Sequence, residues 1–286
     1  MAVRLISSGV GIVIVLLAFF FHNTIVLPLL LSACVGIIRV ELSRAVEGTE
    51  FKLAMTGVMV YGISEPILNY LQYVISPESA FAEPVAIARR LILPVCLFAL
   101  FIEFLWHHGS YKLEQLSFMG GAMCFVPWSL GKLIDMNYYG SGEHGLFYLV
   151  LALCGAWIAD SGAYFSGVFL GKHKLCPNIS PKKTVEGFVG GLISNAVIFL
   201  GIFIVYAHIR GVEFNVITGI KTALLGIVCA GVSVLGDLTF SVIKREKGIK
   251  DYGKIMPGHG GLTDRFDSVL FVAPVFYLFV HAFTIF

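Results

Sequence analysis

The chain has 286 residues, of which 57% are hydrophobic and only 13% are charged. A water-soluble domain carries roughly 25% charged residues, so the surface of this chain cannot face water on all sides and its excess apolar area must meet lipid. The net charge of +2 is too weak to suggest nucleic acid as a partner, and the mean hydropathy is +0.87. We therefore expect an integral membrane protein, with the lipid bilayer as a partner and no nucleic acid.

The apolar residues are grouped into long runs. A membrane-spanning helix needs roughly 20 mostly apolar residues, and the sequence contains about nine such runs. In chain order they cover residues 5–21, 25–41, 53–75, 86–106, 116–134, 146–169, 188–208, 216–243 and 267–285. The third is interrupted by Glu65-Pro66 and Asn69. Because the runs do not alternate like barrel strands, we predict an all-α integral membrane protein with about nine transmembrane helices.

The first run follows Arg4 and resembles a secretory signal peptide. No convincing small-x-small cleavage site follows it, and residues 22–24 lead directly into the second run. We therefore expect a retained first span.

Lysine and arginine in the loops predict the orientation of the chain. With nine spans, one side holds 15 positive residues, including Arg4, Arg39 and Lys52, and the other side holds 5. We therefore predict a cytoplasmic N-terminus, in the inner membrane if the source is bacterial, with the two most basic loops on the cytoplasmic face. We also predict an N-terminal membrane region of about five spans, residues 1–145, and a C-terminal catalytic membrane region of about four spans, residues 146–286.

Polar residues gather in three segments of the second half, and the first begins at Asp160 inside the sixth span. An aspartate inside a span costs about 2.5–3.5 kcal/mol on insertion scales. Asp160 and the similarly placed Asp237 therefore each need a cation, a metal ion or a water-filled cavity. A structural Asp–Lys pair between helices is the alternative.

The second polar segment runs from residue 171 to 187 and contains Ser180-Pro181-Lys182-Lys183. Serine followed by proline is typical of a helix N-cap and the first helical position. We predict that this helix start directs free N–H groups, together with Lys182 and Lys183, toward phosphate oxygens. An ordinary capped loop is the alternative.

The third polar segment, residues 236–267, mixes basic and acidic residues around a glycine-rich turn. On a helix, Asp237, Ser241 and Lys244 share one face that leads to a basic cluster. This cluster could alternatively be only a topology signal or a patch for lipid headgroups. Interleaved carboxylates favour a phosphate and metal site instead.

The turn in this segment contains Gly258, Gly260 and Gly261, which let backbone N–H groups approach an anion. We predict that His259 donates to substrate, with a plain loop histidine as the alternative. Asp264 and Asp267 share a helical face if the ninth span begins there. Carboxylates without a nearby His/Cys pattern suit Mg²⁺ rather than Zn²⁺.

The 27 residues SVIKREKGIKDYGKIMPGHGGLTDRFD, from Ser241 to Asp267, closely resemble the signature of the phosphatidate cytidylyltransferase family. The fixed positions of that signature are all matched, by Ser241, Lys244, Arg245, Lys250, Asp251, His259, Gly260, Gly261, Asp264, Arg265 and Asp267. Met256 stands at one tolerant position where Leu, Ile or Phe is expected. The segments DSGAYFSG and ISPKKTVEGF are also similar to the family, so the resemblance covers roughly residues 155–286.

The resemblance implies an enzyme of phospholipid biosynthesis that transfers the cytidylyl group of CTP to phosphatidic acid, giving CDP-diacylglycerol and pyrophosphate, with Mg²⁺. It also implies Asp237 and Asp264 as metal ligands and a possible homodimer. The expected catalytic residues are Asp237, Lys244, Arg245, Lys250, Asp251, His259, Asp264, Arg265 and Asp267. The expected substrate-binding residues are Asp160, Ser180, Lys182, Lys183, Ser241, Gly260 and Gly261. The site should face the cytoplasm, because CTP comes from water while the acyl chains stay in the bilayer.

Two other classes of function remain open. Another CTP-dependent membrane enzyme would form a different CDP-lipid, or a lipid phosphate and CDP if it were a polyprenol-type kinase. A transporter could use Asp160 and Asp237 as ion sites, and would give flux without nucleotide. The lack of internal repeats and the position of the charges in a loop are against a transporter.

Overall fold

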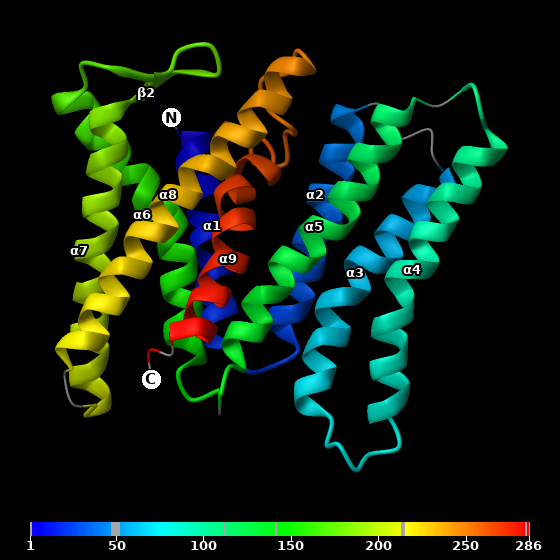
Figure 1. The fold of residues 1–286 in the computed structure, drawn as a ribbon, viewed down its shortest axis with the longest axis horizontal. Coiled ribbons are helices and arrows are strands. Elements are labelled where there is room, and N and C mark those ends of the chain that lie inside the picture. Colours follow the sequence, from blue (N-terminus) through cyan, green and yellow to red (C-terminus); the bar gives the residue numbers. More distant parts are fainter. Residues whose placement is uncertain are drawn as a thin grey trace. The chain divides into compact units, whose positions relative to one another are not determined.

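The structure is a computed structural model that describes residues 2–46, 52–110, 112–140, 142–212, 215–283 and 285. Within these residues the chain forms nine helices and one two-stranded hairpin (Figure 1). The helices are α1 (Ala2–Phe20), α2 (Val26–Ala45), α3 (Lys52–Val74), α4 (Ala82–Trp106), α5 (Leu113–Asn137), α6 (Gly145–Leu170), α7 (Val185–Arg210), α8 (Val216–Glu246) and α9 (Thr263–Phe283). The strands are β1 (Lys174–Cys176) and β2 (Ser180–Thr184). The predicted all-α class is confirmed, with the hairpin as a small addition.

Six of the described helices are long and apolar enough to cross a membrane, namely α2, α4, α6, α7, α8 and α9. The first helix contains a shorter apolar stretch, Ile6–Phe20. These helices indicate a multi-pass integral membrane protein, whereas the count of nine spans and the orientation stay predictions. The side chains of Arg4 and Lys52, which entered the orientation prediction, lie outside the described part of the chain.

Arg39 does not lie in a loop, although it was counted with the loop charges. The second helix continues to Ala45, four residues beyond the predicted end of its span, and Arg39 is only 1% exposed inside it. A buried side chain in the middle of a packed helix says nothing about which loops are positive. Its use in the orientation prediction was therefore wrong.

The contacts divide the chain into two compact units. Unit 1 contains Met1–Tyr138 and Lys247–Asp264, and unit 2 contains Tyr139–Glu246 and Arg265–Phe286. The segment between α8 and α9 therefore belongs with the N-terminal helices. The assignment of catalysis to residues 146–286 stays a prediction.

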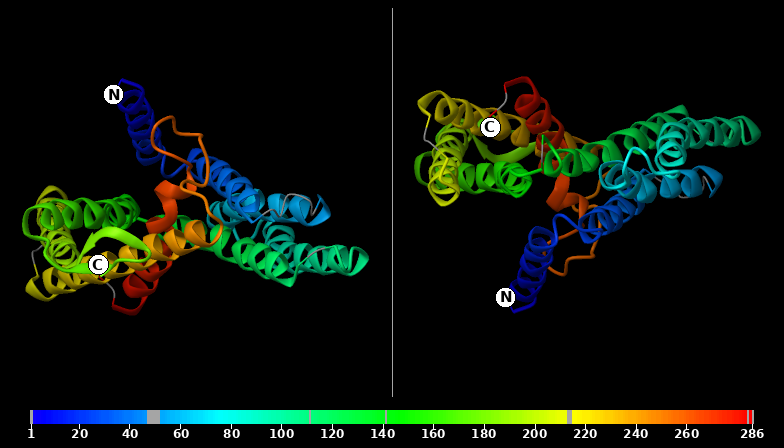
Figure 2. Two further views of the ribbon diagram at one scale, coloured as in Figure 1. Left: turned by 90° about the horizontal axis from the view of Figure 1, so that it is seen from above. Right: turned by 90° about the horizontal axis from the view of Figure 1, so that it is seen from below.

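In unit 1, α3 packs against α2, α4 and α5 (Figure 2). The polar interruption of the third apolar run does not break the helix, although Pro66 lies inside α3. The polar side chains of α3 find partners on neighbouring helices. Glu65 pairs with Arg89 of α4 at 3.0 Å, and the Asn69 amide donates to the carbonyl oxygen of Gly131 in α5 at 3.1 Å. Neighbouring helices thus supply the ion-pair and hydrogen-bond partners that lipid cannot supply.

In unit 2, α7 packs against both α6 and α8, and small residues bring α6 and α7 very close. A Cβ at Gly187 of α7 would lie 2.7 Å from the carbonyl oxygen of Ala163 in α6, and one at Gly191 would lie 2.9 Å from that of Ala159. Only glycine permits such an approach between backbones. The small residues of the DSGAYFSG and TVEGFVGG segments therefore determine how these two helices pack.

The prediction of a helix start at Ser180 and Pro181 is wrong. Both residues lie in β2, which pairs antiparallel with β1 through Lys174 opposite Thr184 and Cys176 opposite Ser180. The next helix, α7, begins at Val185 and is capped by Thr184, whose Oγ1 accepts the N–H of Gly187 at 3.1 Å. The strand satisfies backbone groups that a helix start would leave open, and it outcompetes the local capping signal.

Candidate functional site

Unit 2 contains a pocket of about 510 Å³ that collects polar residues from four elements. Asp160 comes from α6, Ser180 and Lys182 come from β2, and Asp237 comes from α8. Lys174 of β1, together with Tyr164, Lys183 and Thr184, completes its polar lining. Every residue that was predicted from the first two polar segments therefore lines one pocket, together with Asp237 from the third.

The central contact of this pocket is an ion pair between Lys183 Nζ and Asp237 Oδ2, at 2.5 Å. The two side chains are 21% and 25% exposed. Apart from this ion pair, the buried Nζ of Lys183 has no hydrogen-bond partner among the described residues. An ammonium group has three donors, so beyond the contact with Asp237 this cation keeps hydrogen-bonding capacity that the described residues do not use. An anionic ligand would satisfy it.

Further carboxylates surround the ion pair. Asp160 lies within electrostatic interaction range of Asp237, Lys183 and Arg265. Asp267, which is 7% exposed, lies within the same range of Asp160 and Asp237. Asp237 therefore has a cationic partner, and the contact fits the structural Asp–Lys pair that was the alternative as well as a binding site.

The predicted face of α8 is also present. Ser241 Oγ donates to Asp237 Oδ1 at 3.3 Å, and Lys244 lies within electrostatic range of Asp267. In the last turn of α8, Arg245 Nε donates to the carbonyl oxygen of Ile179 at 3.4 Å, which connects the helix to the hairpin. Cations at a helix C-terminus also interact favourably with its dipole.

The described residues contain no group of three or more His, Cys, Asp or Glu side chains arranged to hold a metal ion. Hard carboxylate oxygens suit Mg²⁺, and unit 2 supplies Asp160, Asp237 and Asp267. The ligand pair implied by the resemblance, Asp237 and Asp264, is divided between the two units. These metal ligands stay a prediction.

Unit 1 contains the glycine-rich turn. The N–H of Met256 donates to the carbonyl oxygen of Gly260 at 3.1 Å, and that of His259 donates to the carbonyl oxygen of Met256 at 2.8 Å. Gly258 and Gly260 have φ values of 81° and 90°, which residues with a side chain rarely adopt. The glycines at these two positions are therefore required by the backbone itself.

Asp264 closes this turn. Its Oδ2 accepts the N–H of Tyr252 at 2.9 Å and the N–H of Gly261 at 3.0 Å. The ninth helix begins at Thr263, so Asp264 and Asp267 do lie three apart on its first turn. In this structure the Gly261 N–H is donated to a protein carboxylate, and its predicted role toward an anionic ligand stays a prediction.

Asp251 approaches the same glycine as Asp264. A Cβ at Gly260 would lie 3.2 Å from Asp251 Oδ1 and 3.1 Å from Asp264 Oδ2. The two carboxylates therefore flank Gly260 closely. Lys250 and Arg265, the remaining predicted residues, are exposed.

Glu41 of α2 holds the end of the turn and was missed from the sequence. Its carboxylate accepts the N–H groups of Leu262 and Thr263, at 2.9 and 2.7 Å, and the Thr263 hydroxyl at 2.7 Å. The side chain is almost fully buried, and a buried charge needs such partners. The one available signal was a glutamate at the end of an apolar run.

Ser7 and Ser8 of α1 hold the ring of His259 and were also missed. Ser7 Oγ lies 2.8 Å from Nδ1, and Ser8 Oγ lies 3.3 Å from Nε2. Ser7 Oγ also donates to the carbonyl oxygen of Pro257 at 3.1 Å. Two serines in an otherwise apolar run gave no indication of a partner some 250 residues away.

Comparison with known proteins places these features in a family. The sequence profile of the cytidylyltransferase family matches residues 2–283, which is nearly the whole chain. The chain belongs to the cytidylyltransferase family. This agrees with the resemblance of residues 241–267 to the signature of phosphatidate cytidylyltransferases.

Several curated members of the cytidylyltransferase family are similar to the chain. The phosphatidate cytidylyltransferases of Staphylococcus saprophyticus and Staphylococcus aureus (strain COL) are each 42% identical, over 162 and 164 residues, covering 57% of this chain and 60% of each relative. That of Haemophilus influenzae is 47% identical over 156 residues, covering 54% of this chain and 53% of the relative. The chain thus spans less than two thirds of the length of the curated relatives it matches.

Proposed function

We propose that the chain transfers the cytidylyl group of CTP to phosphatidic acid, forming CDP-diacylglycerol and pyrophosphate in phospholipid biosynthesis. Membership of the cytidylyltransferase family and the names of the similar proteins support this activity. The helices that could span a membrane are also consistent with a lipid substrate.

The observation that carries the proposal is the Lys183 ammonium in the unit 2 pocket. It is paired with Asp237 and has further donors that the described residues do not satisfy. Lys182 lies in the same lining and adds a second cation. A triphosphate supplies further anionic oxygens that can accept from these donors.

The chemistry requires positioning rather than a strong base. An anionic phosphate oxygen of phosphatidate attacks the α-phosphorus of CTP, the bond from that phosphorus to the bridging oxygen breaks, and pyrophosphate leaves with the electron pair. Lys183, Lys244 and Arg245 offset the charge of the phosphates and hold them in line. Arginine suits a bidentate phosphate contact, whereas lysine acts as a point charge.

We further propose Mg²⁺ as the cofactor, with Asp237 and Asp264 as its ligands. Asp160 and Asp267 belong to the same unit as Asp237, and Asp267 follows Asp264 by three residues. Their oxygens have the donor chemistry that Mg²⁺ prefers. When bound, Mg²⁺ would neutralise phosphate charge and stabilise the leaving group. A cytoplasmic site and a homodimer are part of the same proposal.

The test uses the full chain, purified in mixed micelles with CTP, Mg²⁺ and phosphatidic acid. We expect stoichiometric pyrophosphate and CDP-diacylglycerol, and at least a hundredfold loss of rate in Asp264→Asn, in the range seen when one charge-stabilising group is removed from an active site. A lipid phosphate and CDP as products would instead identify a kinase.

The control for this substitution is Glu78→Gln, which removes an exposed carboxylate of unit 1 between α3 and α4. It should turn over at the wild-type rate. The thermal midpoint of each variant shows whether it is folded. Near-normal turnover of a folded Asp264→Asn protein would remove this residue from the proposed metal site.

A further inference from the structure

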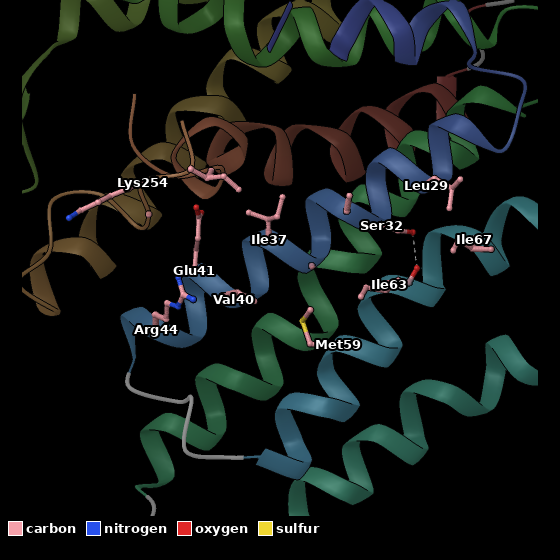
Figure 3. Close-up of a pocket in the computed structure, with 14 residues that line it drawn as sticks. Leu29, Ser32, Ile37, Val40, Glu41, Arg44, Met59, Ile63, Ile67 and Lys254 are labelled. Atoms are coloured by element: carbon pink, nitrogen blue, oxygen red, sulfur yellow. Dashed lines mark hydrogen bonds between the residues drawn. The ribbon is translucent and has the colours of Figure 1, made fainter. Parts of the chain in front are cut away.

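A groove in unit 1 runs along α2 and α3 and ends at the segment that follows α8 (Figure 3). Its volume is about 810 Å³. Most of its walls are apolar and come from the two helices, including Leu29, Ile37, Val40, Met59, Ile63 and Ile67. No residue that was predicted from the sequence as part of the site lines it.

One end of the groove is charged. Figure 3 shows Arg44 and Lys254 at the same end as Glu41, while Leu29 and Ile67 lie at the other end. Neither cation forms an ion pair with a residue in the described part of the chain. The Glu41 carboxylate is already occupied by the N–H groups of Leu262 and Thr263 and the Thr263 hydroxyl. With two cations against one carboxylate, this end of the groove carries a net positive charge, which favours an anion.

The apolar part is long enough for a lipid chain. From Leu29 to Arg44 the helix rises by about 22 Å, at roughly 1.5 Å per residue. One leaflet contributes about 15 Å of hydrocarbon. Leu29, Ile63 and Ile255 remain 50%, 41% and 53% exposed along this path, so their side chains are open to an apolar occupant.

We propose that this groove binds phosphatidic acid, with an acyl chain along α2 and α3 and the phosphate between Arg44 and Lys254. A phosphate monoester carries about −1.5 to −2 charge near neutral pH, which two cations match and which a zwitterionic or neutral lipid lacks. The inference rests on the proposed function and adds to it the place where the lipid enters.

The position of Lys254 connects the groove to the turn described above. Lys254 lies between Tyr252, whose N–H is donated to Asp264, and Met256, which begins the glycine turn. Glu41 lines the groove and also holds the last residues of that turn. A phosphate at this end of the groove would therefore lie beside the loop that carries Asp251, His259 and Asp264.

The test uses the full chain in nanodiscs that contain phosphatidic acid with a photoreactive diazirine near the end of one acyl chain. After irradiation, mass spectrometry identifies the labelled peptides. We expect labelling within α2 and α3, competed by unlabelled phosphatidic acid but not by diacylglycerol. A phosphatidylcholine probe with the same acyl chain should label several-fold less. Equal labelling by the two probes would overturn the proposal.

Two pairs of variants refine the test. The double variant Arg44→Gln/Lys254→Gln should lower labelling by roughly tenfold or more, because each basic residue near a lipid surface contributes about fivefold in affinity. Its control is Arg90→Gln, an exposed arginine of α4 outside the groove. Ala33→Trp fills the groove from an exposed position, and Ala88→Trp is its control on α4.

The outcomes separate this inference from the proposed function. Labelling that depends on Arg44 and Lys254, in a protein that forms no pyrophosphate, would support lipid binding in the groove and would overturn the proposed cytidylyl transfer. Normal turnover, with labelling unchanged in the variants, would overturn the proposal for the groove and leave the proposed enzyme activity standing. If Ala33→Trp changes the mass of the particle and leaves labelling intact, the groove is an interface between two copies, and the proposal fails.

Discussion

At the residue scale, single charged side chains hold the predicted site residues within each unit. Lys183 and Asp237 form an ion pair inside the unit 2 pocket. In unit 1, Glu41 and Asp264 each accept N–H groups from the loop between α8 and α9. These side chains come from distant parts of the sequence, and Glu41 and Asp264 each accept more than one N–H group from the same segment. Removing one should affect the position of the whole segment.

Glu41→Gln should disorder the end of the glycine turn. The amide keeps one acceptor but directs an NH₂ group at donors, and a buried unsatisfied group costs about 1–3 kcal/mol. If that cost falls on the orientation of Asp264, kcat should drop by roughly tenfold or more, with little change in KM for CTP. The rate of cytidylyl transfer and the thermal midpoint are the measurements.

Glu83→Gln is the matched control, because Glu83 is an exposed glutamate in the first turn of α4. It should leave both quantities at wild-type values. A Glu41→Gln protein with full activity would show that the turn does not need this carboxylate.

Lys183→Met should reduce the affinity for CTP. The substitution keeps the length of the side chain but removes the cation, and it leaves Asp237 without its ion-pair partner in the pocket. Charged hydrogen bonds contribute about 1.5–3 kcal/mol, so we expect KM for CTP to rise by roughly tenfold or more. Saturation curves for CTP at fixed phosphatidic acid test this, with Lys172→Met as the exposed control. An unchanged KM would place the triphosphate elsewhere.

At the element scale, the short hairpin and the glycine-lined contact of α6 with α7 place the pocket residues. Lys182 and Lys183 extend from β2, and the cap at Thr184 determines where α7 starts. The glycines of α7 let its backbone pack directly against the backbone of α6. Because the two helices are this close, Asp160 and the hairpin lie around the same cavity. The geometry of the pocket therefore depends on residues that have no polar side chain at all.

Gly187→Ala should destabilise unit 2. The added Cβ would lie 2.7 Å from the Ala163 carbonyl oxygen and 2.8 Å from Thr184 Oγ1, and overpacking of this kind costs about 1–3 kcal/mol. The thermal midpoint of the purified protein should fall. Gly201→Ala, in the same helix with no atom within 4 Å of its added Cβ, should be neutral or slightly stabilising. Equal effects of the two substitutions would contradict the close-contact explanation.

At the scale of the whole molecule, the orientation in the membrane can be tested directly. The charge distribution predicts that the loop with Lys172 is cytoplasmic and the turn with Ser76 is on the opposite side. In a version whose six cysteines are replaced by serine, Ser76→Cys should react with a membrane-impermeant maleimide in intact cells. Lys172→Cys should react only after permeabilisation. The reverse pattern would invert the predicted topology and place the pocket away from CTP.

The sequence by itself determined the membrane class, the helices and the family. Composition excludes a water-soluble surface, and apolar runs must be helical because lipid offers the backbone no other partners. The residues from Ser241 to Asp267 are contiguous, so their pattern is visible without a fold.

Only the tertiary structure decided which residues meet. Glu41 with Thr263, Ser7 with His259 and Lys183 with Asp237 are separated by long stretches of chain, and no local pattern encodes their contact. The capping signal at Ser180 was overridden because pairing with β1 satisfies the same backbone groups. Arg39 was counted with the loop charges although it lies inside the predicted run of residues 25–41, and only the structure shows that its side chain is buried within α2. Apolar runs thus determined the long helices, whereas contacts between distant segments determined the hairpin and which site residues meet.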